Sequence, residues 1–219
     1  MATRQVLAEL GAAYTLRSGV AVAIQSVGGV DAAKRVQAGE AFDVVVLARE
    51  AIDQLTASGF LLPGSRVDLV HSPVALAVAA GATRPDIGSE AAVKQAVLAA
   101  ASLGYSTGPS GNYLLRLFER WGIADAMHSR LVLAPPGVPV AALLARGDVA
   151  LGFQQRSELL NMPGVEVLGT LPPAIEHSTT FSAAPGVATT QAAAVQALLA
   201  FMTSPQASQT IRRHGMVPV

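Results

Sequence analysis

Three short segments rich in glycine and hydroxyl residues could bind an anion. They are Gln25–Asp31, Ser106–Asn112 and Ala134–Pro139, and each lies between an expected strand and an expected helix. Glycine lets a backbone approach a ligand closely, hydroxyls donate hydrogen bonds, and a helix start carries unpaired N–H groups with about half a positive charge. We therefore expect a shared anion site at these turns. The alternative is that the same residues only cap helices, which Ser, Thr and Asp commonly do.

A fourth segment, Gly147–Glu158, predicts a strand that ends in Gln154 and Gln155. A glutamine amide can donate to an anion and accept from a hydroxyl without carrying charge. Both side chains are therefore candidate ligand groups, and the alternative is that they face solvent. Arg156 and Glu158, directly after them, are expected to form a solvated pair.

The elements that must position these turns follow from periodicity. Short β-rich runs alternate with alanine-rich helical runs, which predicts an α/β fold with a mostly parallel sheet covered on both faces. Ligands of open α/β sheets collect at the carboxyl ends of strands, where the turns fall. Expected strands are 20–26, 44–47, 66–78, 102–105, 131–133, 149–153, 165–169 and 178–183. Expected helices are 2–18, 31–38, 50–58, 89–101, 112–121, 140–146, 190–202 and 205–214.

Composition excludes several classes of protein. Lys+Arg 15 balances Asp+Glu 15, so the chain lacks the surplus of positive charge that a nucleic-acid binder uses. Hydrophobic residues make up 51% and charged residues 14%, which excludes a disordered chain. The absence of cysteine excludes disulfides and thiolate chemistry.

We expect no metal and no cofactor. The four histidines, His71, His128, His177 and His214, are far apart and lack the spacing of a metal site. The sequence also has no dinucleotide-binding, phosphate-loop or nucleophile-elbow motif.

No run of residues reaches the roughly 18 apolar positions that a membrane-spanning helix needs. Residues 1–10 predict an amphipathic helix and not an export signal. A parallel α/β sheet usually opens on a strand, whereas this sequence opens on a helix. We therefore expect a first strand to precede Met1.

At these segments the chain resembles the type II periplasmic solute-binding proteins, in the molybdate-binding branch that serves ABC importers. Gly39–Ala48 is similar to the G-x-x-A-D-V-F-x-S-A pattern of that branch, and the turn at Ser106–Gly111 also matches. The resemblance implies two lobes, 1–73 plus 178–219 and an inserted 78–173, with a ligand cleft between them. It further implies a small anionic ligand, an ABC permease as partner and a periplasmic location, with a cytoplasmic location as the alternative because no export signal is seen.

The resemblance also implies which residues bind the ligand. Gln155 stands where the molybdate receptors often have a tyrosine, which replaces a phenol by an amide. Arg4 would lie near the site at the start of the first helix. The full set of candidate ligand residues is Arg4, Ser26, Gly28, Gly29, Ser106, Thr107, Gly108, Ser110, Gly137, Val138, Gln154 and Gln155.

The same segments are similar to aconitate isomerase, a cofactor-free enzyme type related to these receptors, which implies an alternative activity. Arg4 could then clamp one carboxylate of a di- or tricarboxylic acid while the helix starts hold the others. A proton shift needs a general base, and the candidates are His71, Glu158 and His177. His71, on an expected crossing strand, is the best placed of the three, although it could equally be a hydrogen-bonded structural residue.

Overall fold

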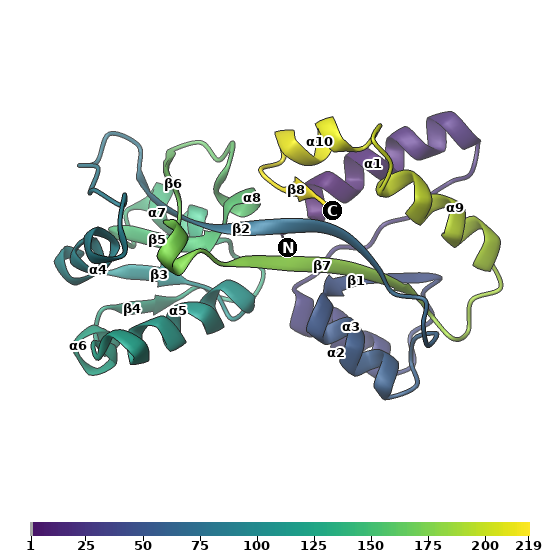
Figure 1. Ribbon diagram of the computed structural model, residues 1–219, viewed down its shortest axis with the longest axis horizontal. Helices are drawn as coiled ribbons and strands as arrows, with labels where there is room; N and C mark the ends of the chain where they lie inside the picture. Colours follow the sequence, from purple (N-terminus) through teal and green to yellow (C-terminus); the bar gives the residue numbers. More distant parts are fainter. Residues whose placement is uncertain (1) are drawn as a thin grey trace. The chain divides into compact units, whose positions relative to one another are not determined.

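A computed structural model describes residues 2–219, which divide into two compact units (Figure 1). Unit 1 comprises the chain up to Ser72 together with Thr179–Val219, and unit 2 comprises Pro73–Ser178. Strand β2 (Val67–Ala79) passes from unit 1 into unit 2, and β7 (Ser178–Pro185) begins at the last residue of unit 2.

Unit 1 has two hydrophobic clusters. In the first, α1 (Arg4–Ser18), α9 (Ala192–Met202) and α10 (Ser208–Arg213) pack against residues of β2 and β7. In the second, α2 (Gly29–Gln37) and α3 (Arg49–Ala57) cover β1 (Val44–Ala48). Strand β1 pairs antiparallel with β7, and β8 (Val217–Pro218) pairs antiparallel with β2.

An ion cluster ties α3 to the sheet of unit 1. Asp68 on β2 accepts a hydrogen bond of 2.6 Å from the Ser182 hydroxyl on β7 and pairs with Arg49 at the start of α3. Burial acts to raise the pKa of Asp68, but the hydrogen bond from Ser182 and the Arg49 guanidinium outweigh it and hold the pKa below its usual value.

The sheet of unit 2 has the strand order β2-β5-β3-β4, with β6 on the other side of β2. Its strands are β3 (Leu103–Tyr105), β4 (Leu131–Leu133), β5 (Leu151–Gln155) and β6 (Val165–Thr170). Its helices are α4 (Glu90–Ala99), α5 (Pro109–Trp121), α6 (Ala124–His128), α7 (Val140–Arg146), α8 (Arg156–Leu159) and the 3-10 turn η1 (Pro173–Ile175).

Alternation along β2 separates the two faces of this sheet. Val74, Leu76 and Val78 join the cluster that contains α4 and α5, whereas Ala75 and Ala77 face the cluster that contains α7. Small residues on the α7 side let that helix lie close to the sheet. At Gly152, for example, an added Cβ would stand 2.6 Å from Leu144 of α7. The large side chains are therefore on one face and the close backbone approach on the other.

The sheets are mixed and not mostly parallel as expected. Strand β3 pairs in parallel with β4 and β5, whereas the pairs β2–β5, β2–β6, β2–β8 and β1–β7 are antiparallel. The antiparallel pairs arise because β2 and β7 run through the sheets as long strands. Helices α6 and α8, the turn η1 and the short strand β8 were not predicted, because a single helical turn or a two-residue strand carries too little periodicity.

The expected strand at 20–26 is wrong. Residues 19–28 have no helix or strand, and none of the strands among residues 2–219 pairs with them. Val20 and Ile24 are 43% and 39% exposed. Apolar alternation gives a segment the right side chains for a strand, but the strand also needs a neighbouring backbone to complete its hydrogen bonds.

Gly111 in the first turn of α5 gives the sharpest test of this packing. A Cβ at this position would stand 1.7 Å from the Ser106 carbonyl oxygen, so the backbone would have to move. We expect Gly111→Ala to lower the free energy of unfolding by about 1–3 kcal/mol in urea titrations, as overpacking does.

Gly29, in the first turn of α2, is the matched control. Its nearest atom, on Leu47, would be 3.8 Å from an added Cβ, which is ordinary contact. Gly29→Ala should be neutral or stabilising by up to about 1 kcal/mol, since alanine favours helix. Equal stability of the Gly111 variant and the wild type would contradict the described turn.

Candidate functional site

The carboxyl ends of β3, β4 and β5 form one edge of the unit 2 sheet. Because these strands are parallel, the helices that follow them, α5, α7 and α8, all begin at this edge. Gly104 of β3 lies opposite Gly152 of β5 and Val132 of β4, which fixes the register of the three strand ends. The candidate ligand residues brought to this edge are Ser106, Thr107, Gly108, Ser110, Gly137, Val138, Gln154 and Gln155.

The start of α5 is the best donor group at this edge. The helix begins at Pro109, three residues earlier than expected, because proline suits a first helical position and lacks the N–H that would go unused. The residue before it, Gly108, has no side chain to cap the helix. Among the described residues, the N–H groups of Ser110 and Gly111 also have no backbone acceptor.

Ser110 is only 1% exposed, and its hydroxyl takes part in none of the hydrogen bonds within residues 2–219. Because the protein offers this hydroxyl no partner, it is available to hydrogen-bond water or a ligand. Ser106 and Thr107 lie in the turn just before α5, and they add two more hydroxyls. The arrangement can donate several hydrogen bonds to one small anion.

The start of α7 is already occupied by a side chain. The Val140 N–H donates to the Gln154 side-chain oxygen at 2.9 Å. Gln154 is 2% exposed, so it holds the start of α7 to β5 from within the protein and does not face solvent. The side-chain oxygen of Gln154 is thus engaged inside unit 2.

The turn before α7 contributes less than expected. The Val138 N–H donates to the Pro135 carbonyl at 3.0 Å, so this N–H is not free for a ligand in this structure. Gly137 is exposed and has a φ of 77°, which suits glycine. Gln155 ends β5 opposite Val74 of β2 and is 2% exposed.

Glu158 is a half-buried carboxyl in the only turn of α8. Burial raises its pKa above the ordinary value. The expectation that Glu158 is a solvated partner of Arg156 is wrong, because Glu158 is half-buried and forms no ion pair with Arg156. Arg156 has no ion pair among the described residues.

The remaining candidate ligand residues belong to unit 1. Arg4 is an exposed residue at the start of α1, and Ser26 is exposed in the extended segment 19–28. Gly28 and Gly29 form the start of α2. An Asp31 carboxylate oxygen lies 3.5 Å from where a Cβ on Gly28 would be, so this helix start has a negative charge of its own.

His71, the histidine considered best placed as a base, is in the part of β2 that pairs with β8 in unit 1. Its Nδ1 lies 3.0 Å from the Thr180 hydroxyl on β7. This bond matches the structural alternative for His71.

Tyr113 is a residue that the sequence reasoning missed. Its ring stacks on His177 with centroids 4.1 Å apart and an interplanar angle of 3°, and its hydroxyl donates to the Ile175 carbonyl at 2.9 Å. Burial raises the pKa of Tyr113. The signal available in the sequence was its place one turn after Ser110, on the helix that starts at the edge. The contacts fasten the first turns of α5 to the segment leading into β7.

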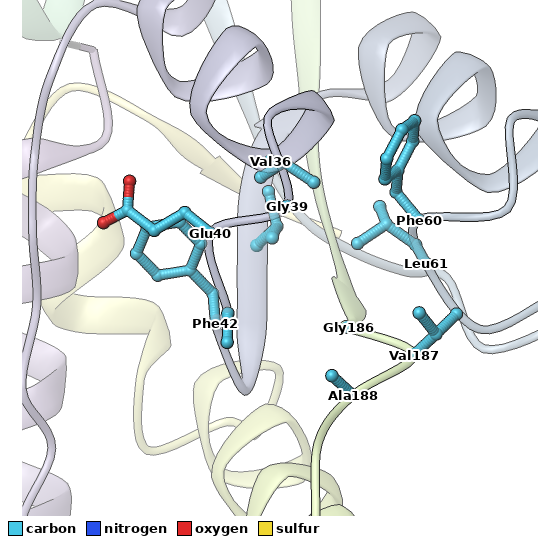
Figure 2. A pocket seen from close by; sticks show the side chains of 11 residues that line it. Val36, Gly39, Glu40, Phe42, Phe60, Leu61, Gly186, Val187 and Ala188 are labelled. Carbon is cyan, nitrogen blue, oxygen red and sulfur yellow. The ribbon is translucent and has the colours of Figure 1, made fainter.

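A separate hollow of about 70 Å³ lies in unit 1 (Figure 2). Its wall is mostly apolar, and the carboxylate of Glu40 is engaged by Arg35. The hollow offers no donor set for an anion. Its lining residues are Val36, Gly39, Glu40, Ala41, Phe42, Val45, Phe60, Leu61, Gly186, Val187 and Ala188.

Two kinds of feature are absent from residues 2–219. No group of three or more His, Asp or Glu side chains could hold a metal ion. Within the same residues, every helix is too short or too polar to cross a bilayer.

Comparison of the sequence with known proteins gives two matches of wide coverage. A family model described as bacterial extracellular solute-binding protein matches residues 1–217. An aconitate isomerase from a Pseudomonas species is 37% identical over 217 residues, which cover 96% of this chain and 82% of the relative.

Comparison with solved structures confirms the expected fold class. The periplasmic molybdate-binding protein of Azotobacter vinelandii superimposes with a TM-score of 0.80 at 21% identity, over 98% of this chain and 95% of that one. The tungstate ABC transporter structure from Geobacter sulfurreducens gives a TM-score of 0.75 at 17% identity, over 95% and 92% of the two chains. At these identities the likeness concerns the fold alone.

The bridge from the Val140 N–H to the Gln154 side chain yields a stability prediction. Gln154→Leu keeps the volume but leaves the buried Val140 N–H without its partner. We expect the free energy of unfolding to fall by about 1–3 kcal/mol, the cost of stranding buried polar groups. Gln95→Leu, at an exposed position of α4, should change it by less than about 0.5 kcal/mol. If the two variants unfold at the same urea concentration, the bridge has no energetic weight.

Proposed function

We propose that this chain, which belongs to the bacterial extracellular solute-binding protein family, binds a small carboxylate anion at the carboxyl edge of the unit 2 sheet. The observation that carries this proposal is the start of α5. There, uncapped N–H groups stand beside Ser110, a residue that is 1% exposed and whose hydroxyl makes no hydrogen bond within the described chain. A carboxylate would satisfy both kinds of donor, and the helix dipole favours its charge.

Two observations favour an organic carboxylate over a tetrahedral oxyanion. Among the proteins compared above, the 37% identical relative is named for aconitate, a tricarboxylate, whereas the molybdate and tungstate proteins are at most 21% identical. The edge also carries a glutamine amide at Gln155 where the resemblance to molybdate receptors expects a phenol. Specificity would then come from neutral donors, in keeping with a chain of zero net charge.

The partner and the location in this proposal are taken from the family. The matching model describes extracellular proteins, and the Azotobacter vinelandii structure is a periplasmic one. We therefore include a periplasmic location and a cognate ABC permease in the receptor proposal, with a cytoplasmic location as its alternative.

A second candidate function, isomerisation of aconitate, is favoured by the wide coverage of the match to aconitate isomerase. An isomerase would use the same donors to hold its substrate and would need one acid–base group to move a proton. Proton NMR of trans-aconitate with the wild-type protein distinguishes the two functions. New signals of cis-aconitate would identify an enzyme, and binding without turnover would identify a receptor.

The carboxylate proposal predicts that removing the Ser110 hydroxyl weakens the binding of aconitate. In calorimetric titrations the wild type should bind trans- or cis-aconitate, and Ser110→Ala should weaken binding by about ten- to a hundredfold, the worth of a hydrogen bond to a charged group. Ser129→Ala, at an exposed position after α6, should leave the affinity unchanged. Heat with molybdate but none with aconitate would overturn the carboxylate assignment, and equal affinity of the two serine variants would remove Ser110 from the site.

A further inference from the structure

We infer that Tyr113 and His177 form a clasp that positions the anion donors at the start of α5. The clasp consists of the stacked rings of these two residues and the hydrogen bond from the Tyr113 hydroxyl to the Ile175 carbonyl. In this role Tyr113 is a positioning residue, which acts on a ligand through Ser110 and Gly111. The inference rests on the proposed function, since it says how the proposed donors are held in place.

The start of α5 lacks the contact that usually fixes a helix start. Gly108, the residue before the helix, makes no side-chain hydrogen bond to the first turn. At α7 the Gln154 side chain makes such a bond, and in doing so it occupies the Val140 N–H. Helix ends without a cap tend to fray, but a cap would use the N–H groups that an anion needs. An anchor that keeps these groups open must therefore hold α5 at another point.

Tyr113 lies where such an anchor is needed. It follows Ser110 by three residues, and residues three apart lie on the same side of a helix, one turn from each other. Its ring stacks on His177 with centroids 4.1 Å apart and an interplanar angle of 3°. Its hydroxyl donates to the Ile175 carbonyl at 2.9 Å. Two contacts from one side chain restrict both the position of the first turn and its rotation about the helix axis.

The segment that receives Tyr113 is itself fixed to the sheet of unit 2. The Leu171 N–H donates to the Val74 carbonyl of β2 at 3.3 Å, and the Val74 N–H donates to the His177 carbonyl at 2.9 Å. Between these two bonds, the consecutive prolines 172–173 restrict the backbone at the start of η1. The clasp therefore ties α5 to one point of β2.

The same point of β2 connects the clasp to the edge of the sheet. Val74 lies opposite Gln155, the last residue of β5. Leu114, the residue after Tyr113, is fully buried and packs in the same cluster as Val74. The start of α5 and the end of β5 thus share one anchor. Donors that are already in place lose less entropy when an anion binds, so the clasp raises affinity without touching the ligand.

The first test is made on the free protein. The Asn112 N–H closes the first turn of α5 by donating to the Gly108 carbonyl at 3.1 Å, so its hydrogen exchange measures fraying of that turn. Tyr113→Leu removes the ring and the hydroxyl, and it should raise the exchange rate of the Asn112 amide by about tenfold. Phe118→Leu, the matched control, removes a buried ring about 12 Å further along the same helix and should leave this rate within about twofold.

The second test is calorimetric titration of the same variants with trans-aconitate. Tyr113→Leu should bind about tenfold more weakly than the wild type, because the ligand must then order donors that move. Tyr113→Phe keeps the stack and should stay within about threefold of the wild type. His177→Leu removes the stack from the other side and should weaken binding as Tyr113→Leu does. Phe118→Leu should keep its affinity although it lowers the urea midpoint, which separates positioning from a general loss of stability.

The results distinguish the inference from the proposed function. An unchanged exchange rate of the Asn112 amide in Tyr113→Leu, or an affinity equal to that of the wild type, overturns the inference and leaves the carboxylate site intact. Equal losses of affinity in Tyr113→Leu and Phe118→Leu also overturn it, since any loosening of α5 would then suffice. A loss in His177→Leu alone would make His177 a ligand contact and not part of a clasp. A wild type that does not bind trans-aconitate overturns the proposed function, and the inference falls with it.

Discussion

Parallel pairing of three short strands is the constraint on which the unit 2 edge depends. Because β4, β3 and β5 run in the same direction, their following helices must all begin at one edge of the sheet. Every helix start leaves N–H groups without partners inside the helix. Three helix starts at one edge therefore carry N–H groups that need hydrogen-bond acceptors. These acceptors can be side chains of the protein, water or a ligand.

The acceptors differ among the three helix starts. At α7 the Gln154 side chain accepts from Val140, and the turn itself accepts the Val138 N–H. At α5 neither solution is used, because Gly108 cannot cap and the Ser110 hydroxyl has no partner among the described residues. This contrast is why we propose the ligand site at α5, and it gives Gln154 a structural role where a ligand contact was expected.

Much of the fold could be predicted from periodicity and glycine placement. The helix at 140–146 and the strand at 131–133 match in both bounds, and α1, α3 and β6 match within two residues. Segment 20–26 failed because its pattern specifies side-chain alternation and not a pairing partner. The turns that precede α5 and α7 could be predicted, since Gly, Ser and Thr mark helix starts. The contacts of Gln154 with Val140 and of Tyr113 with His177 could not, because each joins elements distant in the chain.

Titration of ¹⁵N-labelled protein with trans-aconitate, followed by amide chemical shifts, tests the central claim most directly. A carboxylate at the start of α5 should move the Ser110 and Gly111 amide signals further than those of other residues, because their N–H groups would gain a charged acceptor. Large shifts confined to the apolar hollow around Phe42 and Phe60 in unit 1, with Ser110 and Gly111 unmoved, would contradict this account.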